Sequence, residues 1–294
     1  MVFDSHLGWK LLPNVTKRYP HENQPYTVRT NSRGLRDKEY PYEKPASIFR
    51  VIILGDSQTF GAGGVDSAET FPKLLENSDS HLQVINMGVP AYSTDQEYLS
   101  LQYEGVKYHP DVVVLAVFVN DFFITFHSWD NSILLPKGYF TLDHNDLKYH
   151  LPRASELRVW SRWSYICGAL TRRFRRLTRS RSWQPAPEFN QAEREEIFRH
   201  LLTGMHNICK SVGAEFMVVY IPFKSQKERH FLQDIIAEAG LKDGFQTLDL
   251  TGLLFEADSL QPAYISNDIH LNQRGHRVVA EALRGAIVEA GRRD

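Results

Sequence analysis

The feature that most constrains the fold is a short apolar run that leads into a glycine, an aspartate and a serine. Val51-Ile52-Ile53-Leu54 contains three β-branched residues in succession and no polar one. Such a run predicts a strand that is buried on both faces, as in a parallel sheet covered by helices. Gly55-Asp56-Ser57 follows directly, and a helical pattern begins near Glu69. We therefore expect Ser57 above the carboxyl edge of a sheet, where open α/β folds bind ligands.

A serine at this position has two interpretations. Its hydroxyl can act as a nucleophile, because free backbone N–H groups at the start of the next helix favour developing negative charge. It can equally cap a turn, since serine and aspartate are common in that role. The stretch around Ser57 is compatible with both, so the choice depends on the rest of the chain.

Strands and helices are expected to alternate from residue 49 onward. The predicted strands lie at about 50–54, 83–86, 112–118, 215–221 and 246–250. The predicted helices lie at about 69–75, 93–108, 191–212, 225–239 and 272–290. This alternation implies right-handed crossovers and a mostly parallel sheet with helices on both faces.

Two segments do not fit the alternation. Residues 1–48 carry too little apolar surface for a core of their own, so we expect an N-terminal arm packed on a main domain of residues 49–294. Residues 122–190 are too long for a plain loop. We expect a cap over the carboxyl edge of the sheet, made of a hairpin around His144-Asn145 and a helix over about 155–180.

The composition argues against several classes of protein. A formal net charge of −1 gives no field that would attract nucleic acid. Cys167 and Cys209 have neither a zinc spacing nor a disulfide framework, so we expect both to be reduced and structural.

No apolar run approaches the roughly 18 residues of a membrane span, and the N-terminus does not resemble a signal peptide. We expect a cytoplasmic protein, or a periplasmic or extracytoplasmic one if an upstream signal or anchor was removed.

One segment is strongly basic. Residues 153–181 hold nine arginines and one acid, and six of the arginines lie in Arg172–Arg181. This helix can be a solvated surface. It can also lie on an anionic membrane with Trp160 and Trp163 at the headgroup level, or dock an acidic carrier protein or an anionic substrate. No nucleic-acid-binding motif accompanies it, so we expect no nucleic acid partner.

Further polar residues follow the other predicted strands. Gly88, Asn120 and the segment Asn267-Asp268-Ile269-His270 lie on loops that should converge with Ser57 at one edge of the sheet. Ester hydrolysis by a serine needs a base, an acceptor that orients the base and donors for the oxyanion. All these residue types are present. Asp268 and His270 lie two positions apart, so they would point the same way in an extended loop.

These strand ends resemble the sequence blocks of the SGNH hydrolases, the superfamily of the GDSL esterases and lipases. The four matching blocks, in order along residues 50–290, are Gly55-Asp56-Ser57-Gln58, Asn86-Met87-Gly88, Val119-Asn120-Asp121 and Asp268-Ile269-His270-Leu271-Asn272. Gln58 stands where the family name has leucine, and Phe118 stands where a glycine is usual. The segment Thr30–Asp37 also resembles the one that precedes the first block in many bacterial members.

The resemblance implies a three-layer, flavodoxin-like α/β/α fold with a mostly parallel five-stranded sheet. It implies that Ser57 is the nucleophile and His270 the general base. The oxyanion hole would consist of the backbone N–H groups of Ser57 and Gly88 and the side-chain amide of Asn120. Neither a metal nor an organic cofactor is required.

The residue that orients His270 is less clear from the resemblance. The family usually places an aspartate three positions before the histidine, where this chain has Asn267. Asp268, two positions before, is the expected partner, with Asn267 or a backbone carbonyl as alternatives. Asp56 and Asp121 are expected to brace their turns through hydrogen bonds.

The function implied is a serine esterase that cleaves an acyl ester through an acyl-enzyme on Ser57. A short acyl group such as acetyl, carried by a small-molecule or carbohydrate alcohol, is the preferred substrate. The first alternative is an acyltransferase, because the Asp268–His270 spacing occurs in some acyltransferase-like relatives. The second is a non-hydrolytic binding protein recruited through the basic helix 155–181.

Overall fold

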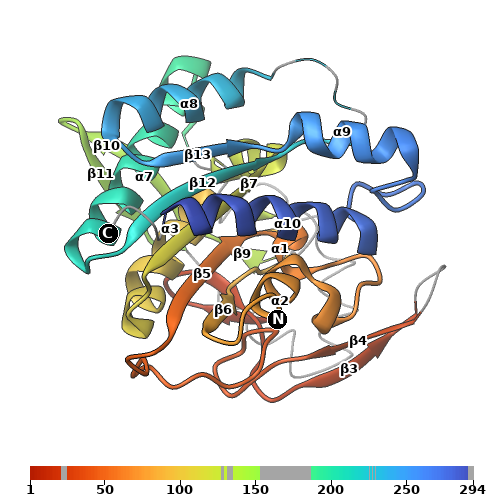
Figure 1. The fold of residues 1–294 in the computed structure, drawn as a ribbon. Coiled ribbons are helices and arrows are strands. Elements are labelled where there is room, and N and C mark those ends of the chain that lie inside the picture. Colours follow the sequence, from red (N-terminus) through yellow and green to blue (C-terminus); the bar gives the residue numbers. More distant parts are fainter. Residues whose placement is uncertain are drawn as a thin grey trace, which may run out of the picture.

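The centre of the molecule is a parallel sheet of five strands, β5 (Phe49–Gly55), β6 (Leu82–Asn86), β7 (Val112–Phe118), β12 (Glu215–Ile221) and β13 (Gln246–Asp249) (Figure 1). The computed structural model describes residues 1–20, 25–126, 129–130, 135–152, 187–224, 226, 228 and 230–290. The strand order is β13-β12-β7-β5-β6. This is the flavodoxin-like order, so the predicted fold class is confirmed.

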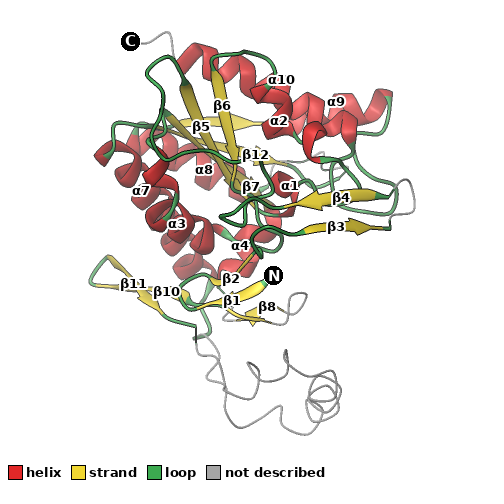
Figure 2. Ribbon diagram, turned by 90° about the horizontal axis from the view of Figure 1, so that it is seen from below, coloured by secondary structure: helices red, strands yellow, loops and turns green. Residues whose placement is uncertain are grey.

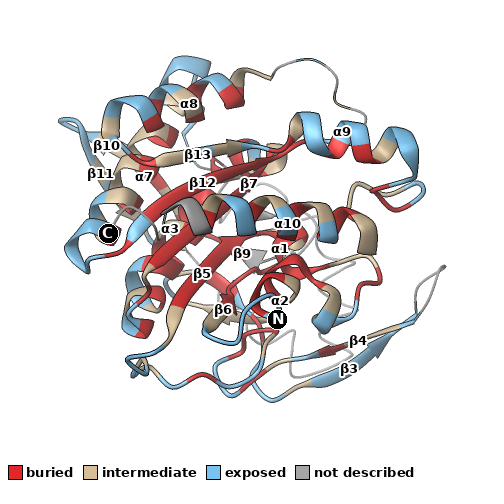
Figure 3. Cartoon of the chain, viewed as in Figure 1, coloured by how far each residue is buried: buried red, intermediate tan, exposed pale blue. Residues whose placement is uncertain are grey.

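Helices cover both faces of the sheet. One face carries α3 (Thr94–Tyr103), α7 (Gln191–Ser211) and α8 (Phe231–Asp243), and the other carries α2 (Phe71–Glu76), α9 (Thr251–Leu260) and α10 (Gln273–Ala290). Ile52 and Leu54 pack with the first set, and Val51 and Ile53 pack with the second. Successive side chains of a strand point to opposite faces, so a strand between two helical layers needs an unbroken apolar run. Figure 3 shows the sheet buried beneath helices that expose their outer sides.

The sequence prediction of helices differs from the structure at several places, of which two concern longer helices. The helix expected from residue 225 begins only at Phe231, and α9 was not expected. The α9 segment exposes Leu253 and Phe255 and buries Leu254, so its apolar residues do not form the one-sided stripe that predicts a surface helix.

The short elements are η1 (Ser67–Glu69), η2 (Gly105–Tyr108), α1 (Ser57–Phe60) and α4 (Val119–Thr125).

The described part of residues 1–48 forms two small antiparallel ribbons and a loop that leads to β5. The ribbons pair β1 (Val2–Asp4) with β2 (Gly8–Lys10), and β3 (Thr16–Tyr19) with β4 (Tyr26–Arg29). Trp9 is completely buried, and its indole N–H donates to the carbonyl of Pro90 at 3.3 Å. Tyr92 returns a hydrogen bond from its hydroxyl to the carbonyl of Trp9 at 2.6 Å. The arm therefore packs on the loop that follows β6.

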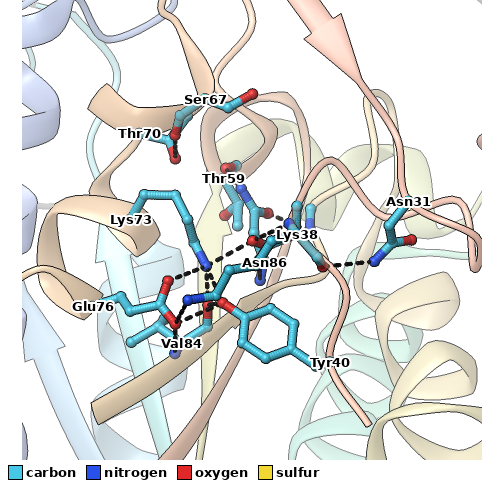
Figure 4. Close-up of polar contacts among 12 residues, drawn as sticks. Asn31, Lys38, Tyr40, Thr59, Ser67, Thr70, Lys73, Glu76, Val84 and Asn86 are labelled. Atoms are coloured by element: carbon cyan, nitrogen blue, oxygen red, sulfur yellow. Dashed lines mark hydrogen bonds and ion pairs between the residues drawn. The ribbon is translucent and has the colours of Figure 1, made fainter. Parts of the chain in front are cut away.

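A buried polar network ties the arm to α2 and β6 (Figure 4). The ammonium group of Lys73 on α2 lies 2.8 Å from the carboxylate of Asp37, 2.9 Å from that of Glu76 and 2.7 Å from the hydroxyl of Tyr40. Asp37 also accepts the backbone N–H of Asn86 at 2.8 Å. Because a buried charge is tolerated only when it is paired and hydrogen-bonded, these contacts fix the position of the arm.

The segment after β7 contains the predicted hairpin. It runs through α4, β8 (Trp129–Asp130) and β9 (Leu135–Pro136) to β10 (Tyr139–Asp143) and β11 (Asp146–His150). His144 and Asn145 join β10 to β11 with φ angles of 50° and 73°, as a two-residue turn with both central residues left-handed requires. Figure 2 shows this hairpin beside β1 and β2, where the hydroxyl of Tyr149 donates to the carbonyl of His6. The predicted helix 155–180 and its arginines lie outside the described residues.

None of the described helices is both long and apolar enough to cross a membrane. Of the two cysteines, Cys209 is a buried free thiol on α7, and Cys167 lies outside the described residues.

Candidate active site

Ser57 lies where β5 passes into α1. Asp56 caps this short helix, because its carboxylate accepts the backbone N–H of Gln58 at 2.8 Å. Strands β6 and β7 lie on the two sides of β5, so the chain leaves β5 at the point where the strand order changes direction. Crevices at such switch points are the usual ligand sites of open α/β sheets.

His270 connects Ser57 to Asp268. Its Nε2 lies 2.9 Å from the Ser57 Oγ, and its Nδ1 lies 2.7 Å from the Asp268 Oδ1. The same carboxylate oxygen accepts the backbone N–H groups of Ile269 and His270. Burial raises the pKa of Asp268, but the charge of His270 and the hydrogen bonds from its ring and backbone outweigh this effect, and the pKa lies below its usual value. Asp268 is thus ionised at neutral pH and can hold the imidazole with a proton on Nδ1.

The loop that carries these residues folds back on itself. Tyr264 and Leu271 form an antiparallel bridge, and the N–H of Ile265 donates to the carbonyl of His270 at 2.9 Å. Asn267 lies at the tip with a φ of 59°, a conformation that asparagine tolerates better than most residues, and its side chain is exposed. Among the residues expected to orient His270, Asp268 makes the contact, and Asn267 serves the turn.

Asn120 comes to the same site from the end of β7. Its side-chain amide donates to the Asp56 Oδ2 at 3.2 Å, and the hydroxyl of Ser57 lies 3.3 Å from that oxygen. Burial raises the pKa of Asp56, although hydrogen bonds from Gln58 and Asn120 oppose the shift. The next residue after Asn120, Asp121, accepts a hydrogen bond from the N–H of Phe118 at 2.7 Å. This bond stabilises the start of α4.

Gly88, an expected oxyanion donor, follows β6 in the loop that packs on α1. Its backbone N–H donates to the Asn86 side-chain oxygen at 2.9 Å, so this donor is already engaged. A Cβ at position 88 would lie 2.4 Å from the nitrogen of Phe60. In this structure Gly88 therefore allows the loop after β6 to pack closely against α1. Three residues further on, Ala91 adopts a φ of 63°, which is strained for a residue with a Cβ.

Substituting Gly88 by alanine is expected to destabilise the protein by about 1–3 kcal/mol, because the new methyl group must displace the backbone of α1. Ester hydrolysis should fall with it, since α1 carries Ser57. Urea unfolding and steady-state kinetics measure the two effects. Gly252→Ala is the control, because a Cβ at position 252 meets no atom within 4 Å. Equal stability of the Gly88→Ala variant and the wild type would contradict the close packing.

His276 lies in the core and outside the site. It is 1% exposed, and its Nδ1 accepts the backbone N–H of Phe71 at 3.1 Å. Burial and the nearby charges of Arg36 and His270 lower its pKa to about 3. His276 is therefore neutral in the folded protein, and its role is to pack α10 against α2.

The low pKa of His276 predicts a loss of stability in acid. Below about pH 6.5 the unfolded chain binds a proton at this histidine, whereas the folded chain does so only near pH 3. The free energy of unfolding should therefore fall as the pH decreases through this window, by up to about 1.4 kcal/mol per pH unit from this group. In the His276→Asn variant the fall should be smaller than in the wild type. Urea unfolding between pH 7 and pH 4 tests this, with His81→Asn at an exposed site as control. Identical slopes in the wild type and the His276→Asn variant would refute it.

Two residues at the site were not predicted to act there. The Gln58 side chain bonds the backbone on both sides of His270. The Arg36 guanidinium in the arm donates to the carbonyls of Phe60 and Gly61 at 2.7 and 2.8 Å, at the end of α1. For Gln58, the sequence signal was that glutamine replaces the leucine of the family name. For Arg36, it was that the segment Thr30–Asp37 resembles the one before the first block in many bacterial members of the family. No group of metal-ligating side chains occurs within the described part of the chain.

The fold and this geometry define a three-layer α/β protein with a serine, a histidine and an aspartate in hydrogen-bonded series. Residues 53–278 match the model of the GDSL-like lipase/acylhydrolase family, and the chain belongs to that family. The predicted relationship is thereby confirmed, and the protein is an enzyme of a hydrolase family.

Similar solved structures share little sequence with this chain. The esterase EstA from Pseudoalteromonas sp. has 10% identity and a TM-score of 0.50, with 82% of this chain and 97% of that one covered. The acetylxylan esterase Axe2 from Geobacillus stearothermophilus has 12% identity and a TM-score of 0.48, with 82% and 94% covered. A putative lipolytic protein of the G-D-S-L family from Desulfitobacterium hafniense has 14% identity and a TM-score of 0.48, with 80% and 97% covered. A search of curated proteins gives no match.

Proposed function

We propose that the protein is a serine esterase that works through an acyl-enzyme on Ser57. The observation that carries this proposal is the series Asp268–His270–Ser57, joined at 2.7 and 2.9 Å. The family supports ester hydrolysis as the class of reaction. His270 Nε2 takes the proton of the Ser57 hydroxyl as the oxygen attacks the acyl carbon, and Asp268 stabilises the resulting imidazolium.

The negative charge of the tetrahedral intermediate needs donors in place before the reaction. The backbone N–H of Ser57 and the side-chain amide of Asn120 are two candidates. The N–H of Gly88 could serve only after it leaves the Asn86 side chain.

The first tetrahedral intermediate collapses when protonated His270 gives its proton to the departing alcohol, which breaks the bond between that alcohol oxygen and the acyl carbon and leaves the acyl-enzyme. In the second half, neutral His270 takes a proton from a water molecule that attacks the acyl carbon on Ser57. The carbonyl re-forms, the bond to the Ser57 Oγ breaks, and the serine regains its proton. We propose a short acyl group such as acetyl, on a small-molecule or carbohydrate alcohol.

Hydrolysis of p-nitrophenyl esters from acetate to decanoate tests this function, with Ser57→Ala as the blank. Turnover that peaks at acetate is expected. Turnover confined to long chains would overturn the short-acyl assignment, and turnover that persists in the blank would overturn the serine mechanism.

Transfer of the acyl group to an alcohol is the second candidate function. The spacing of Asp268 and His270 favours it, because two positions separate them instead of the usual three. Product analysis with and without sugar acceptors separates the two. A new sugar ester formed at the expense of free acid would support transfer.

A partner contact through Arg172–Arg181, with an anionic membrane or an acidic carrier protein, is proposed beside the chemistry. Co-sedimentation with anionic vesicles, with these arginines intact and changed to glutamine, tests the membrane contact.

A further inference from the structure

The side chain of Gln58 lies between the nucleophile and the loop of the base. Gln58 follows Ser57 directly in α1 and is 2% exposed. Its amide nitrogen donates to the carbonyl of Ile269 at 3.0 Å, and its amide oxygen accepts the N–H of Leu271 at 3.1 Å. These two backbone groups belong to the residues immediately before and after His270.

The paired contact holds the backbone of His270 from one side. On the other side, the carbonyl of His270 accepts the N–H of Ile265 at 2.9 Å. The loop segment is thus hydrogen-bonded on both edges, like a strand inside a sheet. With both edges bonded, shifts and rotations of the histidine backbone would require breaking at least one buried hydrogen bond.

This contact closes a ring of interactions around the reacting atoms. The ring runs from Ser57 to Gln58 along the chain, across two hydrogen bonds to the His270 loop, and back through the 2.9 Å contact between His270 Nε2 and Ser57 Oγ. Asp268, the partner of His270, precedes Ile269 in the same segment. A leucine at position 58 could fill the space but could neither donate to Ile269 nor accept from Leu271.

We propose that Gln58 is a positioning residue that sets the distance and orientation of His270 relative to Ser57. It acts through the backbone of Ile269 and Leu271 and does not touch the substrate. The proposal rests on the proposed serine mechanism.

The first test is the Gln58→Leu variant. We expect kcat for ester hydrolysis to fall by about 10–100-fold, with KM within about threefold of the wild type, because an error of about 1 Å in a catalytic group costs this much. The rate at which a fluorophosphonate labels Ser57 should fall by a similar factor. Hydrogen exchange of the Leu271 amide should become faster, since its acceptor is lost.

The Gln58→Glu variant separates positioning from simple packing. A protonated glutamate can donate to Ile269 and accept from Leu271, whereas an ionised one cannot donate. Activity relative to the wild type should therefore recover as the pH is lowered. A Gln58→Leu variant measured alongside should show no such recovery.

Gln83→Leu is the matched control. The Gln83 amide oxygen accepts two hydrogen bonds from Arg50 at 3.0 and 2.7 Å, at the opposite edge of the sheet. This variant should lose stability without a change in labelling rate. If Gln58→Leu labels at the wild-type rate, the proposal is overturned. If the wild type is labelled but hydrolyses no ester, the proposed hydrolysis fails while the labelling comparison still decides the role of Gln58.

Discussion

Replacing Ser57 by alanine is expected to lower kcat for ester hydrolysis by at least about 10⁴-fold. The substitution removes the oxygen that lies 2.9 Å from His270 Nε2, and no acyl-enzyme can then form. The free energy of unfolding should change by less than about 1 kcal/mol, because the hydrogen bonds of the hydroxyl to described residues are those with His270 and, at 3.3 Å, Asp56. Steady-state kinetics and urea unfolding give the two numbers.

A double variant shows whether Ser57 and His270 act as one unit. His270→Ala should lose nearly as much activity as Ser57→Ala, and the combination should lose little more than either alone, since each substitution disables the same step. If the fold-losses in kcat of the two single variants multiply in the double variant, Ser57 and His270 act independently, and the hydrogen-bonded series does not act as one catalytic unit.

Replacing Arg36 by methionine is expected to lower the free energy of unfolding by roughly 3–5 kcal/mol. The guanidinium is 1% exposed and donates to the carbonyls of Phe60, Gly61 and Val65. Burial lowers the pKa of Arg36 to about 10, so the group stays charged at neutral pH. Methionine keeps much of the apolar stem but leaves the three carbonyls without this donor.

The Arg36→Met substitution should also lower the reactivity of Ser57. Phe60 and Gly61 close α1, whose first residue is Ser57, so the Arg36→Met variant should label more slowly with a fluorophosphonate. Arg29→Met on β4 is the control, because Arg29 is exposed. A destabilisation below about 1 kcal/mol would show that water replaces the guanidinium at little cost.

The fold could be predicted from local patterns. The run Val51–Leu54 needed helices on both faces, and the alternation of strands and helices then left few topologies. The strand ends also pointed to Ser57 and Asn120, because parallel strands bring their carboxyl ends to one edge. His270 lies between α9 and α10, so the family resemblance carried its prediction. The arm was harder to place, since its ribbons are short and its contact with the domain depends on buried polar groups such as Lys73 and Asp37.

Two residues of the family blocks have contacts in the structure that were not predicted from the sequence. Phe118, in place of a glycine, stacks on Phe223 with ring centres 6.2 Å apart, while its N–H donates to the carboxylate of Asp121 at the start of α4. Gly88 matches a family block, yet its N–H bonds the side chain of Asn86. The stacking of Phe118 depends on the loop that carries Phe223, whereas the bond from Gly88 to Asn86 is local and spans two residues.

The sequence by itself determined the layers of this protein, the order of its elements and the residues that could carry a serine mechanism. Periodicity and chain order encode these features, since each depends on neighbouring residues or on the twist of a sheet. The spacing of Asp268 and His270 already made Asp268 the expected partner, and the structure decided between it and Asn267. Only the tertiary structure showed that Gln58 bonds the backbone on both sides of His270 and that Arg36 bonds the carbonyls at the end of α1. Hydrogen bonds between positions 24 to 213 residues apart depend on angles and distances between loops, which no local pattern specifies.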